Sequence, residues 1–165
     1  MPEIYSPAED SYFLSEVLKK NIKNYKINIL DMGSGSGIQA QTLIDLGINP
    51  KNITLVDINP KSISFLKKKF SKSKIIKSNL FSNIKGKFEL IVFNPPYLPE
   101  HKYDKQPDTS GGKKGSEIIN KFLHRNVKLK SDFKDPFLIP LSFHCNTTFK
   151  YRRKGQHLMY VRIIQ

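Results

Sequence analysis

The 165-residue chain has the length of one domain, and its 38% apolar residues exclude a disordered protein. No apolar run reaches the roughly 18 residues of a membrane helix, and the N-terminal residues lack the pattern of a secretory signal. The single Cys145 excludes an internal disulfide and a cysteine-rich zinc site. We therefore expect a cytoplasmic, single-domain protein without a bound metal.

The net charge of +14 comes from 28 basic and 14 acidic residues. Such an excess is typical of proteins that contact nucleic acid, so RNA or ribosome contact through a basic surface is one interpretation. The other is genome composition, because Lys, Ile and Asn, which A+T-rich codons encode, make up 55 of the 165 residues. The charge is unevenly distributed: residues 61–87 contain nine Lys and no acidic residue, whereas residues 1–18 contain four acidic residues and no Lys or Arg.

The first predicted element is a helix near the N-terminus. Ser6 to Glu9 form a capping box, with Pro7 at the first helical position. Apolar residues then recur at helical spacing and predict one buried face: Leu14, Val17, Leu18 and Ile22. We expect a helix that begins at this capping box.

Strands and helices alternate after this helix. Short apolar runs predict strands over residues 27–31, 53–56, 74–77 and 88–93. One helix is expected over 37–46, and Asn59-Pro60 opens another with Ile63, Leu66 and Phe70 on one face. The alternation predicts an α/β fold with a Rossmann-like, doubly wound, mostly parallel sheet and helices on both faces.

The second half of the chain is less regular. Residues 98–114 are polar and long enough for a functional loop, and a helix is expected at Ile118, Ile119, Phe122, Leu123 and Val127. Strands are expected within 136–143 and 157–164, whereas residues 144–156 show no period. We divide the single domain, 1–165, into an N-terminal helix (1–26), a core (27–130) and an atypical or truncated tail (131–165).

A glycine-rich turn, Asp31 to Gly37, follows the first strand. Its three alternate glycines allow the backbone to pass close to a ligand at the carboxyl end of the sheet. Asp57, 20 residues beyond Gly37, is placed to accept hydrogen bonds from two ribose hydroxyls. Because the glycine spacing differs from that of dinucleotide sites and Asp31 would attract a methionine ammonium, we predict S-adenosylmethionine rather than NAD. The alternative is a tight turn with a solvated Asp57.

The tetrad Asn94-Pro95-Pro96-Tyr97 follows the fourth strand. Methylation of a planar NH₂ group requires acceptors for its hydrogens, and the Asn94 side-chain oxygen and the Pro95 carbonyl can supply them. Pro95 and Pro96 fix the backbone so that the two acceptors converge, and Tyr97 can stack on the amide or base. The alternative interpretation is a proline turn that ends the strand, with Tyr97 as part of the core.

These motifs, together with Tyr5 to Ser11 and Gly111 to Ile119, resemble the HemK family of class I S-adenosylmethionine-dependent methyltransferases over roughly residues 4–128. The branch that they most resemble is the archaeal and eukaryotic one, which N5-methylates the glutamine of the Gly-Gly-Gln motif of class I release factors. The resemblance implies that the tetrad is catalytic. It implies cofactor contacts from Tyr5, Pro7, Glu9, Ser11, Asp31, Gly33, Ser34, Gly35, Asp57, Ile58, Asn79, Leu80 and Asn94. The family usually has Glu at Asp31 and Asp at Asn79, and both replacements keep an acceptor.

The resemblance further implies two partners: the release factor as substrate, and a small zinc-binding activator subunit that extends the sheet at the 74–77 strand. In the family a strand, a helix and a terminal hairpin follow residue 128, and 37 residues are too few for all of them. An adenine-N6 methyltransferase acting on RNA or DNA is an alternative, because adenine presents the same planar NH₂ group. A non-catalytic binding module with a degenerate tail is a further alternative.

Overall fold

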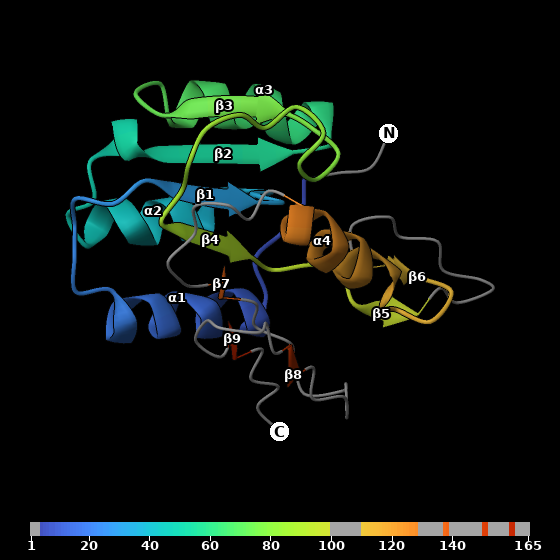
Figure 1. Ribbon diagram of the computed structural model, residues 1–165. Helices are drawn as coiled ribbons and strands as arrows, with labels where there is room; N and C mark the ends of the chain where they lie inside the picture. Colours follow the sequence, from blue (N-terminus) through green and yellow to red (C-terminus); the bar gives the residue numbers. More distant parts are fainter. Residues whose placement is uncertain (1–3, 100–109, 129–136, 139–149, 152–158, 161–165) are drawn as a thin grey trace.

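The computed structural model describes residues 4–99, 110–128, 137–138, 150–151 and 159–160. Its centre is a five-stranded parallel sheet in the order β3-β2-β1-β4-β7 (Figure 1). The strands are β1 (Ile29–Met32), β2 (Ile53–Asp57), β3 (Lys74–Lys77), β4 (Leu90–Phe93) and β7 (Phe137–Leu138). This order, with the chain returning across β1 to reach β4, confirms the doubly wound α/β fold.

The helices of the described residues are α1 (Glu9–Asn21), α2 (Ile38–Asp45), α3 (Pro60–Lys69) and α4 (Glu117–Lys128), with one 3-10 turn, η1 (Pro50–Asn52). Two small sheets accompany the main one: parallel β5 (Leu98–Pro99) and β6 (Ser110–Gly112), and antiparallel β8 (Lys150–Tyr151) and β9 (Met159–Tyr160). In the described part of the chain, none of the helices has the length and apolar content needed to cross a membrane.

Alternate residues of the strands face two separate apolar clusters. Ile29, Leu55 and Val92 pack with side chains of α1, α2 and α3 on one face of the sheet. On the other face, Phe122 of α4 packs against Phe93, with 4.7 Å between the ring centroids. Burial on both faces explains why these strands read as continuous apolar runs rather than as alternating ones.

The N-terminal helix begins at Glu9, so the predicted capping box is wrong. Ala8 is the N-cap and has no side-chain cap, while Ser6 is exposed. The segment before Glu9 is extended and passes beside the glycine turn, where the Tyr5 Cβ lies 3.7 Å from the position that a Cβ at Gly35 would occupy. A helical Pro7 would not allow this crossing. The predicted buried positions Leu14, Leu18 and Ile22 are confirmed.

The other predicted elements of the core are present with small shifts of their ends. Asn59 caps α3 as expected, because its side chain accepts a hydrogen bond from the Lys61 backbone N–H at 2.9 Å. The strand 74–77 lies at an edge of the main sheet, as predicted. In the tail, β7 and β9 fall within the expected ranges, β8 lies where no strand was expected, and the remaining tail residues lie outside the described ones.

Candidate active site

Three strands end side by side and bring the predicted motifs to one edge of the sheet (Figure 1). In the register of the sheet, Met32 of β1 pairs with Val56 of β2 and with Phe93 of β4. The glycine turn, Asp57 and Asn94 therefore follow at the same level. This is the carboxyl edge of the sheet, where doubly wound folds bind their ligands.

Asp57 holds the glycine turn in place. Its Oδ2 accepts a hydrogen bond from the Gly35 backbone N–H at 2.8 Å, and its Oδ1 accepts one from the Asn59 N–H at 2.7 Å. Burial raises the pKa of the Asp57 carboxyl, and these backbone donors oppose that shift. Each carboxylate oxygen can accept a second hydrogen bond, so Asp57 retains acceptor capacity for a ligand hydroxyl.

Two residues of the turn serve the fold itself. Ser34 Oγ donates to the Asp31 backbone oxygen at 2.8 Å and accepts from the Val56 N–H at 3.0 Å, so this side chain ties β1 to β2. Gly37 has a φ of +76°, and a Cβ there would lie 2.3 Å from the Phe70 ring. We had expected all three glycines to serve a ligand, but Gly37 instead allows the start of α2 to approach α3.

Asp31 is buried behind the turn, with 2% of its surface exposed. Its Oδ2 has no hydrogen-bond partner within the described part of the chain. Burial, with a smaller contribution from the neighbouring Asp57 carboxylate, raises the pKa of this carboxyl to about 7. An unpaired buried carboxylate oxygen is energetically costly, so this position fits a ligand that brings a cation or a hydrogen-bond donor.

Asn94, the first residue of the tetrad, is held by the start of α1. Its Nδ2 donates to Asp10 Oδ2 at 3.1 Å, with Ser11 Oγ at 3.4 Å. Asp10 Oδ1 in turn accepts from the Tyr5 hydroxyl at 3.1 Å. Because the amide nitrogen is engaged, the buried Asn94 Oδ1 has a fixed direction, and no group of the described residues pairs with it.

Asp10 is the functional candidate that the sequence analysis missed. It follows Glu9 directly, and both are acidic residues in the first turn of α1. Glu9, which we had expected to border the cofactor, is exposed. The only sequence signal for Asp10 was its place in the segment from Tyr5 to Ser11. The helix start decides which of the two adjacent carboxylates faces the tetrad, and the sequence alone does not give that start.

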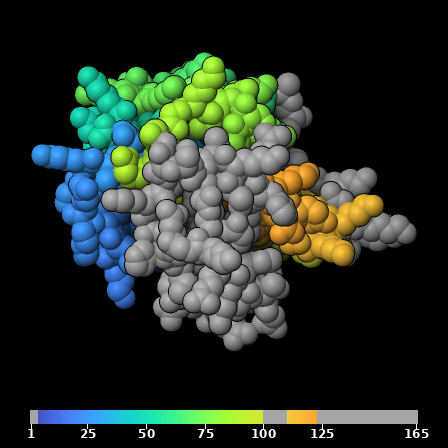
Figure 2. Space-filling model, in the orientation of Figure 1, coloured from blue at the N-terminus to red at the C-terminus, as the bar shows by residue number. Residues whose placement is uncertain are grey.

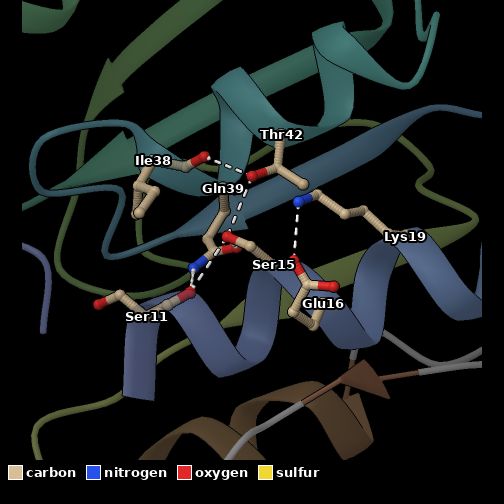
Figure 3. Close-up of polar contacts among 7 residues, drawn as sticks. All are labelled: Ser11, Ser15, Glu16, Lys19, Ile38, Gln39 and Thr42. Atoms are coloured by element: carbon tan, nitrogen blue, oxygen red, sulfur yellow. Dashed lines mark hydrogen bonds and ion pairs between the residues drawn. The ribbon is translucent and has the colours of Figure 1, made fainter. Parts of the chain in front are cut away.

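A buried polar cluster fixes α1 against α2 (Figure 3). Ser15 Oγ donates to the Ser11 carbonyl oxygen at 3.1 Å, and Gln39 Nε2 donates to the same oxygen at 2.8 Å. Thr42 Oγ1 donates to Ser15 Oγ at 3.0 Å. These contacts join the first turns of both helices, so they hold the α1 segment that carries Asp10 and Ser11 beside β4.

β6 and the turn that follows it pack directly against the tetrad backbone. A Cβ at Gly111 would lie 2.7 Å from the Pro96 carbonyl oxygen, and one at Gly115 would lie 2.3 Å from the Tyr97 carbonyl oxygen. Pro95 is buried, and Tyr97 is half-buried against the α4 side of the core. Both segments that carried the family resemblance, before β1 and after the tetrad, therefore meet the tetrad.

The loop after β3 also reaches this edge. The Ser78 N–H donates to the Asp57 carbonyl oxygen at 2.9 Å, which places the following Asn79 and Leu80 beside the end of β2. Leu80 has a φ of +49°, a conformation that non-glycine residues rarely adopt and that occurs preferentially at functional sites. Asn79 is exposed, and so is 60% of Ile58.

Of the predicted residues, the structure places Tyr5, Ser11, Asp31, Asp57 and Asn94 in contact with one another or with the glycine turn. The side chains of Pro7, Glu9, Ile58 and Asn79 are partly or fully exposed. The site therefore combines buried polar side chains, such as Asp31 and Asp57, with more exposed residues around them.

Residues 7–108 match the family model described as the methyltransferase small domain. The chain belongs to the methyltransferase small domain family. Among its relatives, a Methanocaldococcus jannaschii protein named for N5-glutamine methyltransferase activity is 37% identical over 133 residues, which cover 74% of this chain and 64% of that relative. The Deinococcus radiodurans release factor glutamine methyltransferase is 32% identical over 95 residues, 55% of this chain and 34% of the relative. These relatives confirm the resemblance to the HemK family.

Other relatives are named for methylation of ribosomal RNA. The Serratia proteamaculans ribosomal RNA small subunit methyltransferase C is 35% identical over 101 residues, which cover 59% of this chain and 29% of that relative. Among solved structures, the glycopeptide N-methyltransferase MtfA aligns with a TM-score of 0.56 at 12% identity, over 91% of this chain and 61% of MtfA. This last similarity supports the fold of the methyltransferase small domain.

Proposed function

We propose that the chain is an S-adenosylmethionine-dependent N-methyltransferase that methylates N5 of the glutamine in the Gly-Gly-Gln motif of a class I release factor. The observation that carries this proposal is the state of the Asn94 amide. Its nitrogen is engaged by Asp10, and its buried oxygen has no partner among the residues that the structure describes. A buried acceptor with a fixed direction and no protein donor is suited to receive a substrate N–H.

An acceptor at Asn94 is what methylation of an amide or aromatic NH₂ group requires. The nitrogen lone pair of such a group is delocalised, and acceptors on its hydrogens favour the geometry in which the lone pair is free to attack. Asn94 Oδ1 and the Pro95 carbonyl oxygen take the two hydrogens, and Tyr97 stacks on the planar group. Catalysis by these residues is positioning and charge distribution, without a covalent enzyme intermediate.

The residues at the carboxyl edge fit S-adenosylmethionine. The unpartnered Asp31 Oδ2 would accept from the methionine ammonium, and Asp57 would accept from the ribose hydroxyls. Gly33 and Gly35, with φ of +65° and +53°, would leave the turn open to close approach, and Asn79, Leu80 and Ile58 would border the adenine. The chemistry that the bound cofactor supplies is an electrophilic methyl group. Tyr5 and Ser11, which contact Asp10, would close the site from the α1 side.

The relatives favour glutamine over adenine as the methyl acceptor. A relative covered to 64% of its length is named for N5-glutamine methylation, whereas the ribosomal RNA methyltransferase is covered to only 29%. The fit of Gly111 and Gly115 against the tetrad backbone adds support, since this segment belongs to the resemblance to the release-factor branch. Adenine-N6 methylation of RNA or DNA uses the same acceptors and is the competing function.

We infer a second subunit from the same resemblance: a small zinc-binding activator that would pair with the free edge of β3. Within the described residues β3 pairs on one side only, with β2, and its Ile75 and Ile76 are partly buried. An exposed strand edge is a ready template for a strand from another chain. Co-expression and co-purification with the candidate activator of the same organism test this pairing.

Labelled methyl transfer in a cell extract tests the function. Purified protein and S-adenosylmethionine with a radiolabelled methyl group are added to an extract of the source organism, which supplies any activator, beside an Asn94→Ala control. We expect protease-sensitive label in one protein of release-factor size. Nuclease-sensitive label would replace the glutamine assignment with the adenine one. No label above the control, with no cofactor binding at millimolar concentration, would favour a non-catalytic module.

A further inference from the structure

Nine lysines lie between the start of α3 and the beginning of β4, and all nine are exposed. They are Lys61, Lys67, Lys68, Lys69, Lys72, Lys74, Lys77, Lys85 and Lys87. Residues 61–87 contain no Asp or Glu, so no carboxylate of this segment neutralises them. We call this the lysine surface. In Figure 2 the segment, drawn in shades of green, forms the upper part of the molecule.

One compact α/β unit carries the lysine surface. Lys67, Lys68 and Lys69 occupy the last turn of α3, and Lys74 and Lys77 are the first and last residues of the edge strand β3. Ser73, just before β3, donates from its Oγ to the Pro50 carbonyl oxygen at 2.8 Å and so ties the connecting turn to the body of the protein. Most of the cations are therefore carried by α3 and β3, and the others by the segments that connect these elements to each other and to the rest of the fold.

Structural roles account for part of this arrangement only. Lys74 and Lys77 lie on the edge strand, where lysines limit pairing with arbitrary strands and where the proposed activator would dock, so RNA binding is not inferred from these two residues. Cations in the last turn of α3 interact favourably with the helix dipole. Lys72 and Lys85, however, belong to neither element, so neither role applies to them.

An aromatic side chain lies among the lysines. Phe65 of α3 is 38% exposed, and the Lys69 Nζ lies 5.7 Å from its ring centroid. Surfaces that bind single-stranded nucleic acid combine cations for the phosphates with exposed aromatic rings on which bases stack. An acidic protein partner would use the cations but has no group that requires the exposed ring. The combination favours RNA.

We propose that the lysine surface binds single-stranded RNA, with phosphates on the lysines and a base on Phe65. This inference goes beyond methyl transfer and does not depend on it. Lysine contacts each phosphate as a point charge, so binding is not sequence-specific and weakens steeply with salt. The surface would hold the protein near ribosomal or other RNA while the carboxyl edge acts on its own substrate.

Fluorescence anisotropy with a labelled single-stranded oligouridine tests the proposal across a salt series. The variant K67Q/K68Q/K72Q should bind about tenfold more weakly at low salt and reduce the slope of log affinity against log salt by about 2. The matched control, K20Q/K23Q/K26Q, removes the same charge from three exposed lysines at the end of α1 and beyond it. We expect the control to bind almost as the unchanged protein does.

A second variant tests stacking separately from charge. Because Phe65 is partly exposed, Phe65→Ala should leave folding intact, weaken oligouridine binding about fivefold and leave the salt slope unchanged. Circular dichroism and S-adenosylmethionine binding, which these changes should not alter, verify that each variant is folded. Equal weakening of oligouridine binding by both triple variants, or no binding at low salt, would overturn the proposal. The lysines would then reflect the amino-acid composition of the chain and not an RNA-binding surface. Equal affinity for polyglutamate of matched length would overturn it in favour of an acidic protein partner.

Discussion

The side chain of Asn94 is held by Asp10, with 3.1 Å between Nδ2 and Oδ2, although 83 residues separate the two in the chain. The contact joins the first turn of α1 to the end of β4 and fixes which end of the amide faces the site. Asn94 Oδ1 is buried and, as far as residues 4–99 and the other described segments go, unpaired. Asp10 acts through Asn94, and we regard it as a positioning residue rather than a catalytic one.

Asp10→Asn should reduce kcat strongly while leaving the affinity for S-adenosylmethionine nearly unchanged. The side-chain oxygen of the new amide would keep the hydrogen bonds from the Tyr5 hydroxyl and the Ser11 N–H, so its NH₂ group would face the Asn94 NH₂ group. Two donors cannot pair, so the Asn94 amide would rotate and place a donor where the substrate N–H requires an acceptor. We expect a loss of about 100-fold in kcat, in the range reported for misplaced catalytic groups. Steady-state kinetics and calorimetry of cofactor binding measure the two quantities.

Glu9→Gln is the matched control for this experiment, since it makes the same chemical change at the adjacent, exposed carboxylate. It should retain nearly full activity. A similar loss of activity in both variants would mean that the negative charge of the helix start matters, and the positioning role of Asp10 would be rejected. Unchanged kcat in Asp10→Asn would reject it as well.

The affinity for S-adenosylmethionine should rise with pH up to about 7, because burial raises the Asp31 pKa to about 7 and the cofactor ammonium requires the ionised carboxylate. Below that pH, affinity should fall by up to about tenfold per unit. Asp31→Asn should bind more weakly at pH 8 and show no such dependence. Calorimetry across pH 5.5–8 measures this, and a flat profile for the unchanged protein would contradict the role of Asp31.

The same carboxyl affects stability without the cofactor. Its folded-state pKa lies above the ordinary value of 3.8, so protonation favours the folded state. The contribution is fully present below about pH 4 and is lost as the pH rises through about 7. Urea unfolding of Asp31→Asn should therefore show a smaller fall in stability between pH 4 and 7 than the unchanged protein. An identical pH profile for both proteins would contradict the burial of an ionisable Asp31.

Gly37→Ala should destabilise the fold by about 2–4 kcal/mol, because the new Cβ would meet the Phe70 ring and the residue has a positive φ. Gly47→Ala is the matched control: its φ is +95°, but no atom lies within 4 Å of a Cβ there, so it should cost about 1 kcal/mol. Chemical denaturation of both variants gives the difference. Equal losses would show that backbone strain alone, and not the approach of α2 to α3, requires Gly37.

Gly111→Ala should lower activity without abolishing cofactor binding. The added Cβ would meet the Gly115 and Pro96 carbonyl oxygens, and the displacement would move the tetrad away from the substrate position. Gly86→Ala, where nothing lies within 4 Å, is the control and should remain active. Loss of cofactor binding together with activity in Gly111→Ala would indicate that the contact supports the whole site and not the tetrad alone.

Much of the core was predictable because its strands are short, apolar and separated by helices with clear signals. Asn59-Pro60 marked the start of α3, and the positions of Leu66 and Phe70 gave its buried face. The start of α1 was not predictable from local pattern. Ser6 to Glu9 match a capping box, but the long-range contacts of Tyr5 and Asp10 hold the preceding segment extended.

The motifs of the site were predictable from the sequence, but the contacts that hold them in place were not. The convergence of the glycine turn, Asp57 and Asn94 follows from parallel strand order alone. The roles of Ser34 and Gly37 within the fold depend on contacts with Val56 and Phe70, which sequence spacing does not show. Asp10 depends in the same way on how α1 docks, and that docking is set by the buried cluster around Gln39.

The most direct test of the account uses a purified release factor of the source organism, S-adenosylmethionine and this protein together with its activator. Mass spectrometry of the Gly-Gly-Gln peptide is compared for the unchanged protein and for Asn94→Ala, whose cofactor binding is measured in parallel. We predict one added methyl group on the glutamine side chain with the unchanged protein and none with Asn94→Ala at equal cofactor binding. An unmodified glutamine, with methyl label found in adenine of added RNA or DNA, would contradict the account.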